Sequence, residues 1–195
     1  MQIIKMSDMT LCYIPTLSFK EKIEVARLLV KLGVNSLELP NISDNKVDSL
    51  FVKTVAPFLK DTALCVSAFD ISGVDTAVSA LKDVKNPEIK IELPLSTVGM
   101  EYQLHIKPAK MAEYIEKTVS YAKTSVKTVE FSVTDATRAD KEFLVNCIKT
   151  AKSAGADRVT LSDNAADILP DDFALFAAEI KELCDIPVYV CCQNK

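Results

Sequence analysis

TVEFSVTDATRADKEFLVNCIKTAKSAGADRVTLSDNA, residues 128–165, is the stretch that decides the fold. Its apolar, β-favouring residues at 129–133 predict a buried strand, and apolar residues recurring at helical spacing over 143–151 predict a helix. Gly155 can adopt a positive φ and stops that helix, and a second strand follows over 159–163. The stretch is therefore predicted to be one β-α-β unit, of the size expected for a parallel crossover.

Polar residues close both strands of this unit. Ser132, Thr134 and Asp135 end the first strand, and Ser162, Asp163 and Asn164 end the second. Because ligand sites in parallel α/β folds form at the carboxyl ends of the strands, a small-ligand role is open for Asp163 and Asn164.

The same alternation of strand and helix runs along the whole chain. Ser18 with Glu21 three residues later is a capping-box pattern, Gly33 ends the helix that follows, and Asp44 is a candidate cap for the next one. The predicted strands cover 3–6 (ending at 7–8), 34–39, 63–68, 89–93, 129–133, 159–163 and 187–190. The predicted helices cover 19–32, 45–58, 74–84, 108–122, 143–151 and 170–183, with a loop over 97–102.

Seven strands alternating with six helices predict a parallel sheet covered on both faces. Residues 25–40 weakly resemble residues 147–163, and a repeated β-α unit favours a TIM-barrel-like arrangement over a doubly wound sheet. The chain has four glycines and no G-x-G-x-x-G after the first strand, which argues against a dinucleotide or phosphate-loop fold. A barrel needs eight strands and usually about 250 residues. The 195 residues therefore predict one incomplete TIM-barrel domain, 1–195, whose edge strands a second copy or a complementing barrel subunit would cover.

Composition limits the classes of partner. A net charge of −4 and a pI near 5.1 give the chain no attraction to nucleic acid or an anionic membrane. No apolar run approaches the roughly 20 residues of a membrane span. Six cysteines without C-x-x-C spacing indicate mostly free thiols and a cytoplasmic location. The single histidine, His105, is predicted to be a surface loop residue, and its solitude leaves little room for histidine-based catalysis.

In motif order and spacing the chain resembles the N-terminal three-quarters of the catalytic barrel of the DRE-type metallolyases. This family includes homocitrate synthase, to which the chain looks most similar, isopropylmalate synthase and hydroxymethylglutaryl-CoA lyase. SDMTL at 7–11 resembles the start of the family's D-T-T-L-R-D-G-E-Q signature, and KEKIEVARLLVKLGVNSLELP at 20–40 its first helix and second strand. PLSTVGMEYQL at 94–104, EFSVTDATRADKEFL at 130–144 and GADRVTLSDNAADILP at 155–170 resemble the loop after strand four and strands five and six.

The resemblance implies carbon–carbon bond formation or cleavage beside a carbonyl. In that family a divalent metal polarises a 2-oxo acid, and in the synthases acetyl-CoA attacks it as an enolate. Carried over residue by residue, the resemblance makes Asp8 the metal-binding aspartate, Glu38 a site glutamate and Ser132 a substrate-contacting hydroxyl. With Asp163 and Asn164, Glu38 and Ser132 form the predicted substrate-binding set.

Several positions depart from the family pattern. Cys12 stands where the signature arginine is expected, Gly99 where a histidine or glutamine binds substrate, and Glu130 where homocitrate synthases use an arginine for the substrate carboxylate. Asn164 replaces the threonine of D-T-V-G. The strand-seven metal motif H-x-H-N-D becomes CCQNK at 191–195, so both metal histidines are lost.

These departures predict a degenerate homologue that has lost metal-dependent condensation and binds a small carboxylate or a partner chain. The alternative is an active acyltransferase or aldolase that acts on a 2-oxo acid through an altered site. No cofactor is expected; a divalent metal, if retained, would use Asp8 and Cys191, and zinc at Cys12, Cys191 and Cys192 is a softer-ligand alternative. Cys191 as a nucleophile lacks a histidine partner. Asp135 and Arg138, which could be taken for a catalytic pair, are predicted to cap the following helix.

Overall fold

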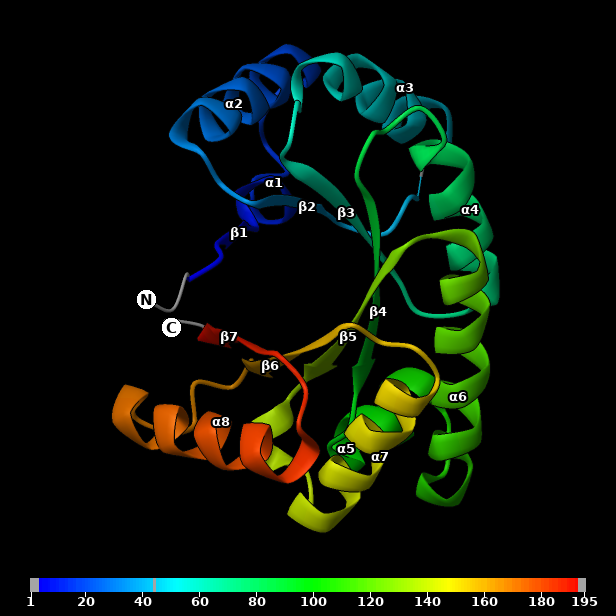
Figure 1. Cartoon of the computed structure of the whole chain (residues 1–195), viewed down its shortest axis with the longest axis vertical. Helices are drawn as coiled ribbons and strands as arrows, with labels where there is room; N and C mark the ends of the chain where they lie inside the picture. Colours follow the sequence, from blue (N-terminus) through cyan, green and yellow to red (C-terminus); the bar gives the residue numbers. More distant parts are fainter. Residues whose placement is uncertain (1–3, 44, 193–195) are drawn as a thin grey trace. The chain divides into compact units, whose positions relative to one another are not determined.

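The computed structural model describes residues 4–43 and 45–192. Strands and helices alternate along them (Figure 1). The strands are β1 Ser7–Asp8, β2 Ser36–Leu39, β3 Ala63–Ala68, β4 Pro87–Pro94, β5 Thr128–Thr134, β6 Arg158–Asp163 and β7 Val188–Cys192. The helices are α1 Thr10–Tyr13, α2 Phe19–Leu32, α3 Asn45–Val55, α4 Ile71–Leu81, α5 Thr97–Gly99, α6 Pro108–Ser125, α7 Lys141–Ser153 and α8 Pro170–Cys184, with single turns η1 Ala56–Phe58, η2 Met100–Leu104 and η3 Ala136–Arg138.

The strands form one seven-stranded sheet in chain order, β1-β2-β3-β4-β5-β6-β7. The pairs β1–β2, β2–β3, β5–β6 and β6–β7 are parallel. Helices connect successive strands, as parallel pairing requires. The predicted TIM-barrel-like class is confirmed, and the described residues add two short helices, α1 and α5, to the six that were predicted.

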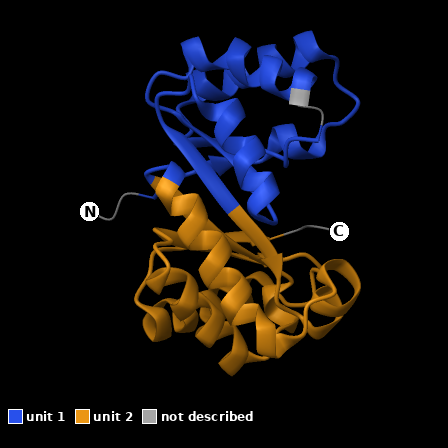
Figure 2. Cartoon of the chain, turned by 90° about the vertical axis from the view of Figure 1, so that its right-hand side faces the viewer, with its two compact units in different colours: residues 1–90, 125–127 blue, residues 91–124, 128–195 orange. Residues whose placement is uncertain are grey.

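The chain divides into two compact units (Figure 2). Unit 1 comprises residues 1–90 and 125–127, and unit 2 comprises residues 91–124 and 128–195. In unit 1 all side chains of β2 and β3 are buried, and in unit 2 all of β6 are buried. Strands without an exposed face are those of a sheet covered on both sides, which agrees with the near-continuous apolar runs in the sequence.

Unit 1 begins at a shorter strand than predicted. The strand is Ser7–Asp8, paired with Ser36 and Leu37, and the predicted residues from 4 to 6 lie outside it. Met6 instead donates its N–H to the side-chain oxygen of Asn35 (2.8 Å) and accepts the Asn35 N–H (2.9 Å), so a side chain replaces the ladder there. Ile3 and Asp44, the predicted cap of α3, lie outside the described residues.

Helix α2 follows its sequence signals closely. Ser18 accepts the N–H of Glu21, the Glu21 carboxylate accepts the N–H of Ser18, and Gly33 closes the helix at a φ of 88°. The capping box and the glycine stop are both confirmed. Each satisfies backbone groups that the ends of a helix would otherwise leave unpaired.

The β-α-β unit of the opening stretch is also confirmed. Strand β5 pairs in parallel with β6, so that Phe131 lies opposite Val159 and Ser132 opposite Thr160. The predicted cap was wrong: Asp140, whose carboxylate accepts the N–H of Phe143, begins α7. Asp135 adopts a left-handed conformation at a φ of 61° instead.

The predicted loop over 97–102 is helical. Ser96 caps α5 by accepting the N–H of Gly99 (3.1 Å), and η2, a π-helical turn, continues to Leu104. A Cβ atom on residue 99 would lie 2.4 Å from Cβ of Pro94, so this close approach requires glycine. His105 ends the turn and is exposed, as predicted.

All six cysteines are free thiols, which confirms that prediction. Among the described residues, no helix combines the length and apolarity needed to cross a membrane.

Candidate functional site

Glu38 of β2 is a buried carboxylate in unit 1 with a partner on each oxygen. Its Oε1 accepts the Ser7 hydroxyl at 2.5 Å, and its Oε2 accepts the ammonium of Lys90 from β4. The Lys90 side chain is 1% exposed and that of Glu38 is 6% exposed. Two charges removed from water this far depend on each other, so the predicted site glutamate is one half of an internal ion pair.

Asp8, the predicted metal-binding aspartate, lies at the end of β1. Its Oδ1 accepts the N–H of Thr10 at 2.9 Å, which fixes the first turn of α1. Cys12 on that helix donates its thiol to the backbone oxygen of Glu38 at 3.4 Å. Asp8 therefore fixes the start of α1, and Cys12 links α1 to β2.

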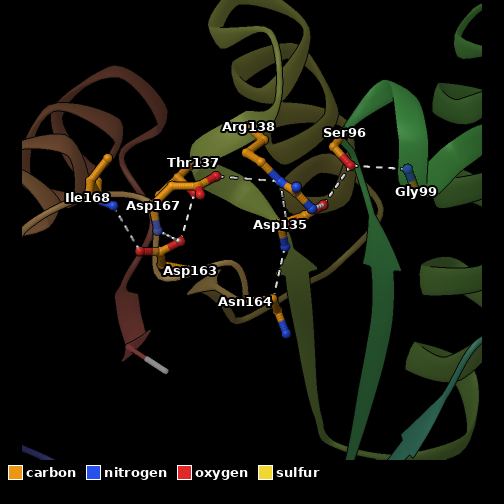
Figure 3. Close-up of polar contacts among 9 residues, drawn as sticks. All are labelled: Ser96, Gly99, Asp135, Thr137, Arg138, Asp163, Asn164, Asp167 and Ile168. Carbon is orange, nitrogen blue, oxygen red and sulfur yellow. Dashed lines mark hydrogen bonds and ion pairs between the residues drawn. The ribbon is translucent and has the colours of Figure 1, made fainter. Parts of the chain in front are cut away.

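A strand-end cluster lies in unit 2, at the carboxyl ends of β4, β5 and β6 (Figure 3). It comprises Ser96, Asp135, Thr137, Arg138, Asp163, Asn164 and Asp167. The Asp135 carboxylate accepts the Ser96 hydroxyl (2.8 Å) and the Arg138 guanidinium, with its Nε at 3.0 Å. The hydrogen bond to Asp135, together with its charge, raises the pKa of Arg138.

Asp163 and Asn164, two predicted substrate-binding residues, hold loops of this cluster together. Oδ1 of Asp163 accepts the Thr137 hydroxyl (3.0 Å) and the N–H of Asp167 (3.2 Å). Oδ1 of Asn164 accepts the N–H of Asp135 at 2.9 Å. The carboxylate and the amide thus bind the chain itself, and the left-handed conformation of Asp135 is fixed by contacts on both its side chain and its backbone.

Ser132 lies inside β5, 3% exposed and opposite Thr160 of β6. Two residues before it, the buried Glu130 carboxylate accepts Nε of Arg158 at 2.6 Å and the Thr160 hydroxyl at 2.7 Å. The Arg158 guanidinium also stacks 4.9 Å from the centre of the Tyr189 ring. The Glu130 carboxylate is therefore neutralised by an arginine from the next strand.

Cys191 of β7 lies opposite Ser162, and Cys192 lies opposite Asp163. Cys191 is half-buried and Cys192 is exposed. Burial and, to a smaller degree, the charge of Asp163 raise the pKa of Cys192. The thiolate needed by a nucleophile or a soft metal ligand is therefore disfavoured at Cys192. Gln193 lies outside the described residues.

The donor set fits a hard divalent cation poorly. Among residues 4–43 and 45–192, no group of three or more histidine, cysteine, aspartate and glutamate side chains forms a metal-binding arrangement. Glu38 holds an ammonium on one oxygen, and Cys191 offers sulfur where magnesium or manganese takes oxygen or nitrogen.

Sequence reasoning missed Lys90, Ser96 and Arg158. A signal existed for Lys90: in PEIKIELP of β4, charged residues alternate with apolar ones, and such a period of two places charges on one face of the strand. Arg158 is the first residue of β6, but the predicted strand began one residue later, so Arg158 was assigned to the preceding loop. Ser96 carried no distinguishing pattern.

The HMGL-like family matches residues 11–194. A 2-isopropylmalate synthase from Listeria monocytogenes serotype 4a is 37% identical over 172 residues, covering 86% of this chain and 34% of the relative. One from Methanopyrus kandleri, described as probable, is 31% identical over 182 residues, covering 92% and 35%. The chain thus spans about a third of the length of the curated relatives it matches.

Solved structures agree on the fold. An HMG-CoA lyase from Brucella melitensis superposes with a TM-score of 0.76 at 14% identity, covering 94% of this chain and 68% of the lyase. A deoxyribose phosphate aldolase from Aeropyrum pernix gives 0.65 at 15% identity, covering 96% and 74%. At these identities the likeness concerns the fold alone. The family match over nearly the whole chain confirms the resemblance seen in the motifs, and the chain belongs to the HMGL-like family.

Proposed function

We propose that this isopropylmalate synthase-like protein has lost metal-dependent condensation and binds a small carboxylate, of the 2-oxo acid class, at the carboxyl ends of its strands. The proposal rests mainly on one observation: the carboxylates at the strand ends already hold hydrogen-bond or ion-pair partners within the chain, which leaves them poorly placed to bind a metal. Glu38, Asp135 and Asp163 each bind groups of the chain itself.

The Glu38–Lys90 pair sets a cost for metal binding. A cation that took Glu38 as a ligand would displace the Lys90 ammonium, which is 1% exposed. Leaving that ammonium buried and unpaired costs about 3–5 kcal/mol. The energy a divalent ion gains from one more oxygen ligand is offset by this loss, so the pair favours a metal-free state.

The alternative is an active acyltransferase or aldolase with an altered site. Its support is the 37% identity to a 2-isopropylmalate synthase over 172 residues. The two functions differ in what they require: the first needs binding of a 2-oxo acid without turnover, and the second needs turnover.

One experiment separates them. The purified protein is analysed for magnesium, manganese and zinc by mass spectrometry, then assayed for acetyl-CoA-dependent thiol release with a panel of 2-oxo acids, with and without added metal. The Listeria monocytogenes relative is the positive control. We expect no stoichiometric metal, no turnover, and saturable 2-oxo acid binding by calorimetry. Stoichiometric metal or turnover would overturn loss of condensation, and absence of binding would overturn the ligand.

A homo-oligomer or a complementing barrel subunit stays a prediction. Its measure is the molar mass in solution by light scattering, at the concentrations used for calorimetry. A mass of two or more copies supports it, and a monomer contradicts self-association.

A further inference from the structure

A groove of about 550 Å³ lies in unit 1 between α3 and α4, two helices that contact each other. It belongs to the helical layer and contains no residue of the strand ends. Its lining residues are Lys46, Ser49, Leu50, Lys53, Ser79, Ala80 and Lys82.

Helical spacing explains why these residues meet. On α3, positions 46, 49, 50 and 53 follow the i, i+3, i+4, i+7 pattern and form one face. Phe51, Val52 and Val55 of the same helix are buried in the core, on the other side. On α4 and just beyond it, Ser79 and Lys82 are three residues apart and exposed, and Ala80 is buried beneath them.

The lining is positively charged within an acidic protein. Among the residues that the structure describes, three lysines and two serines line the groove and no aspartate or glutamate does, although the whole chain carries a net charge of −4. Asp48, the acidic residue in the first turn of α3, accepts the N–H of Ser43 at 3.0 Å. A concave surface lined by charges of one sign concentrates the field and attracts an ion of the other sign.

We propose that the groove binds the diphosphate or triphosphate group of a small molecule. Several lysine ammoniums placed around one concavity match a chain of phosphates, because each acts as a point charge and each phosphate carries charge. The serine hydroxyls add neutral donors. The volume lies within the range of small-molecule sites, about 300–1,000 Å³.

Calorimetry with sodium pyrophosphate and with ADP, at low and at physiological salt, tests the proposal on the full chain. We expect saturable binding of one ligand that weakens with salt, because exposed charges are screened. Similar affinity for both ligands identifies the phosphate chain as the recognised group, and tighter ADP binding adds a nucleoside contact; both support the proposal.

Matched variants locate the site. Lys53→Gln and Lys82→Gln each weaken pyrophosphate binding about threefold, and the double variant weakens it about tenfold, as exposed charge pairs are individually weak. Lys20→Gln, on α2, makes the same charge change outside the groove and leaves the affinity unchanged. Lys53→Arg keeps the charge and retains binding. Absence of saturable binding, or equal loss in Lys20→Gln, overturns the proposal.

Discussion

Each unit contains a buried strand glutamate that pairs with a cation from another strand, but the two cations differ in their exposure to solvent and in their other contacts. In unit 1, Glu38 holds Lys90, whose side chain is 1% exposed. In unit 2, Glu130 holds Arg158, whose side chain is 11% exposed and stacks on Tyr189. Besides its carboxylate, the Arg158 guanidinium contacts the face of the Tyr189 ring and some solvent. A guanidinium is also less strongly hydrated than an ammonium, so burying it costs less. The ammonium in unit 1 therefore depends more strongly on its glutamate than the guanidinium in unit 2 does.

The largest expected effect is at Glu38. Glu38→Gln leaves the Lys90 ammonium buried without its carboxylate and lowers the free energy of unfolding by about 3–5 kcal/mol. Urea denaturation followed by circular dichroism measures it. Glu38→Gln combined with Lys90→Met removes both charges and should recover much of the loss. A loss in the single variant below about 1 kcal/mol would contradict the dependence.

Glu130→Gln should cost less, about 1.5–3 kcal/mol, the range for a hydrogen bond to a charged group. The amide oxygen of the substituted side chain still accepts the Thr160 hydroxyl, and Arg158 keeps the Tyr189 ring. The same urea measurement applies, so the two losses can be compared directly. A larger loss in Glu130→Gln than in Glu38→Gln would show that Arg158 depends on its glutamate more than Lys90 does, which contradicts the expected ranking.

Cys147 of α7 is a buried titratable group of a different kind, because burial alone, and no opposite charge, shifts its pKa. Burial raises the pKa of its thiol from 9.0 to about 12. The folded pKa is the higher one, so this contribution to stability is complete below pH 9 and is lost as pH rises from 9 toward 12. The loss is at most about 1.4 kcal/mol for each pH unit in that window.

Unfolding of the wild type and Cys147→Ala at about pH 8 and about pH 10 isolates that contribution. The variant is less stable at both values because it loses buried volume, but its stability should fall less between them. An identical fall in both proteins would show that Cys147 does not titrate in this way.

The fold was readable from the sequence because its signals are local. The capping box at Ser18, the glycine stop at Gly33 and the apolar runs that form strands such as β3 each depend on a few neighbouring residues. The residues at the strand ends were also named correctly as polar. The partners of Glu38 and Glu130 were not predicted, because Lys90 reaches Glu38 across 52 positions of the chain and Arg158 reaches Glu130 across 28. The register of the strands determines such pairs. A single sequence indicates that register only through the alternation of polar and apolar residues along each strand.

The predictions of the first strand and of a loop over 97–102 were wrong for a different reason. At Met6 and at Gly99, one side chain, of Asn35 or Ser96, takes over a backbone hydrogen bond and decides the local structure. Propensity scales sum over several residues and carry no weight for a single such contact.

The smallest expected effect is at Asn164, outside both pairs. Asn164→Ala leaves the N–H of Asp135 without its acceptor and costs about 1 kcal/mol in urea unfolding. Asn164→Asp restores an acceptor oxygen but adds a negative charge beside Asp135 and Asp163, so its own loss should shrink as pH falls through the carboxylate range near about 4. If Asn164 instead served ligand binding alone, both variants would unfold like the wild type and only 2-oxo acid affinity would fall. The two measurements together decide whether this amide supports the loop or also recognises the ligand.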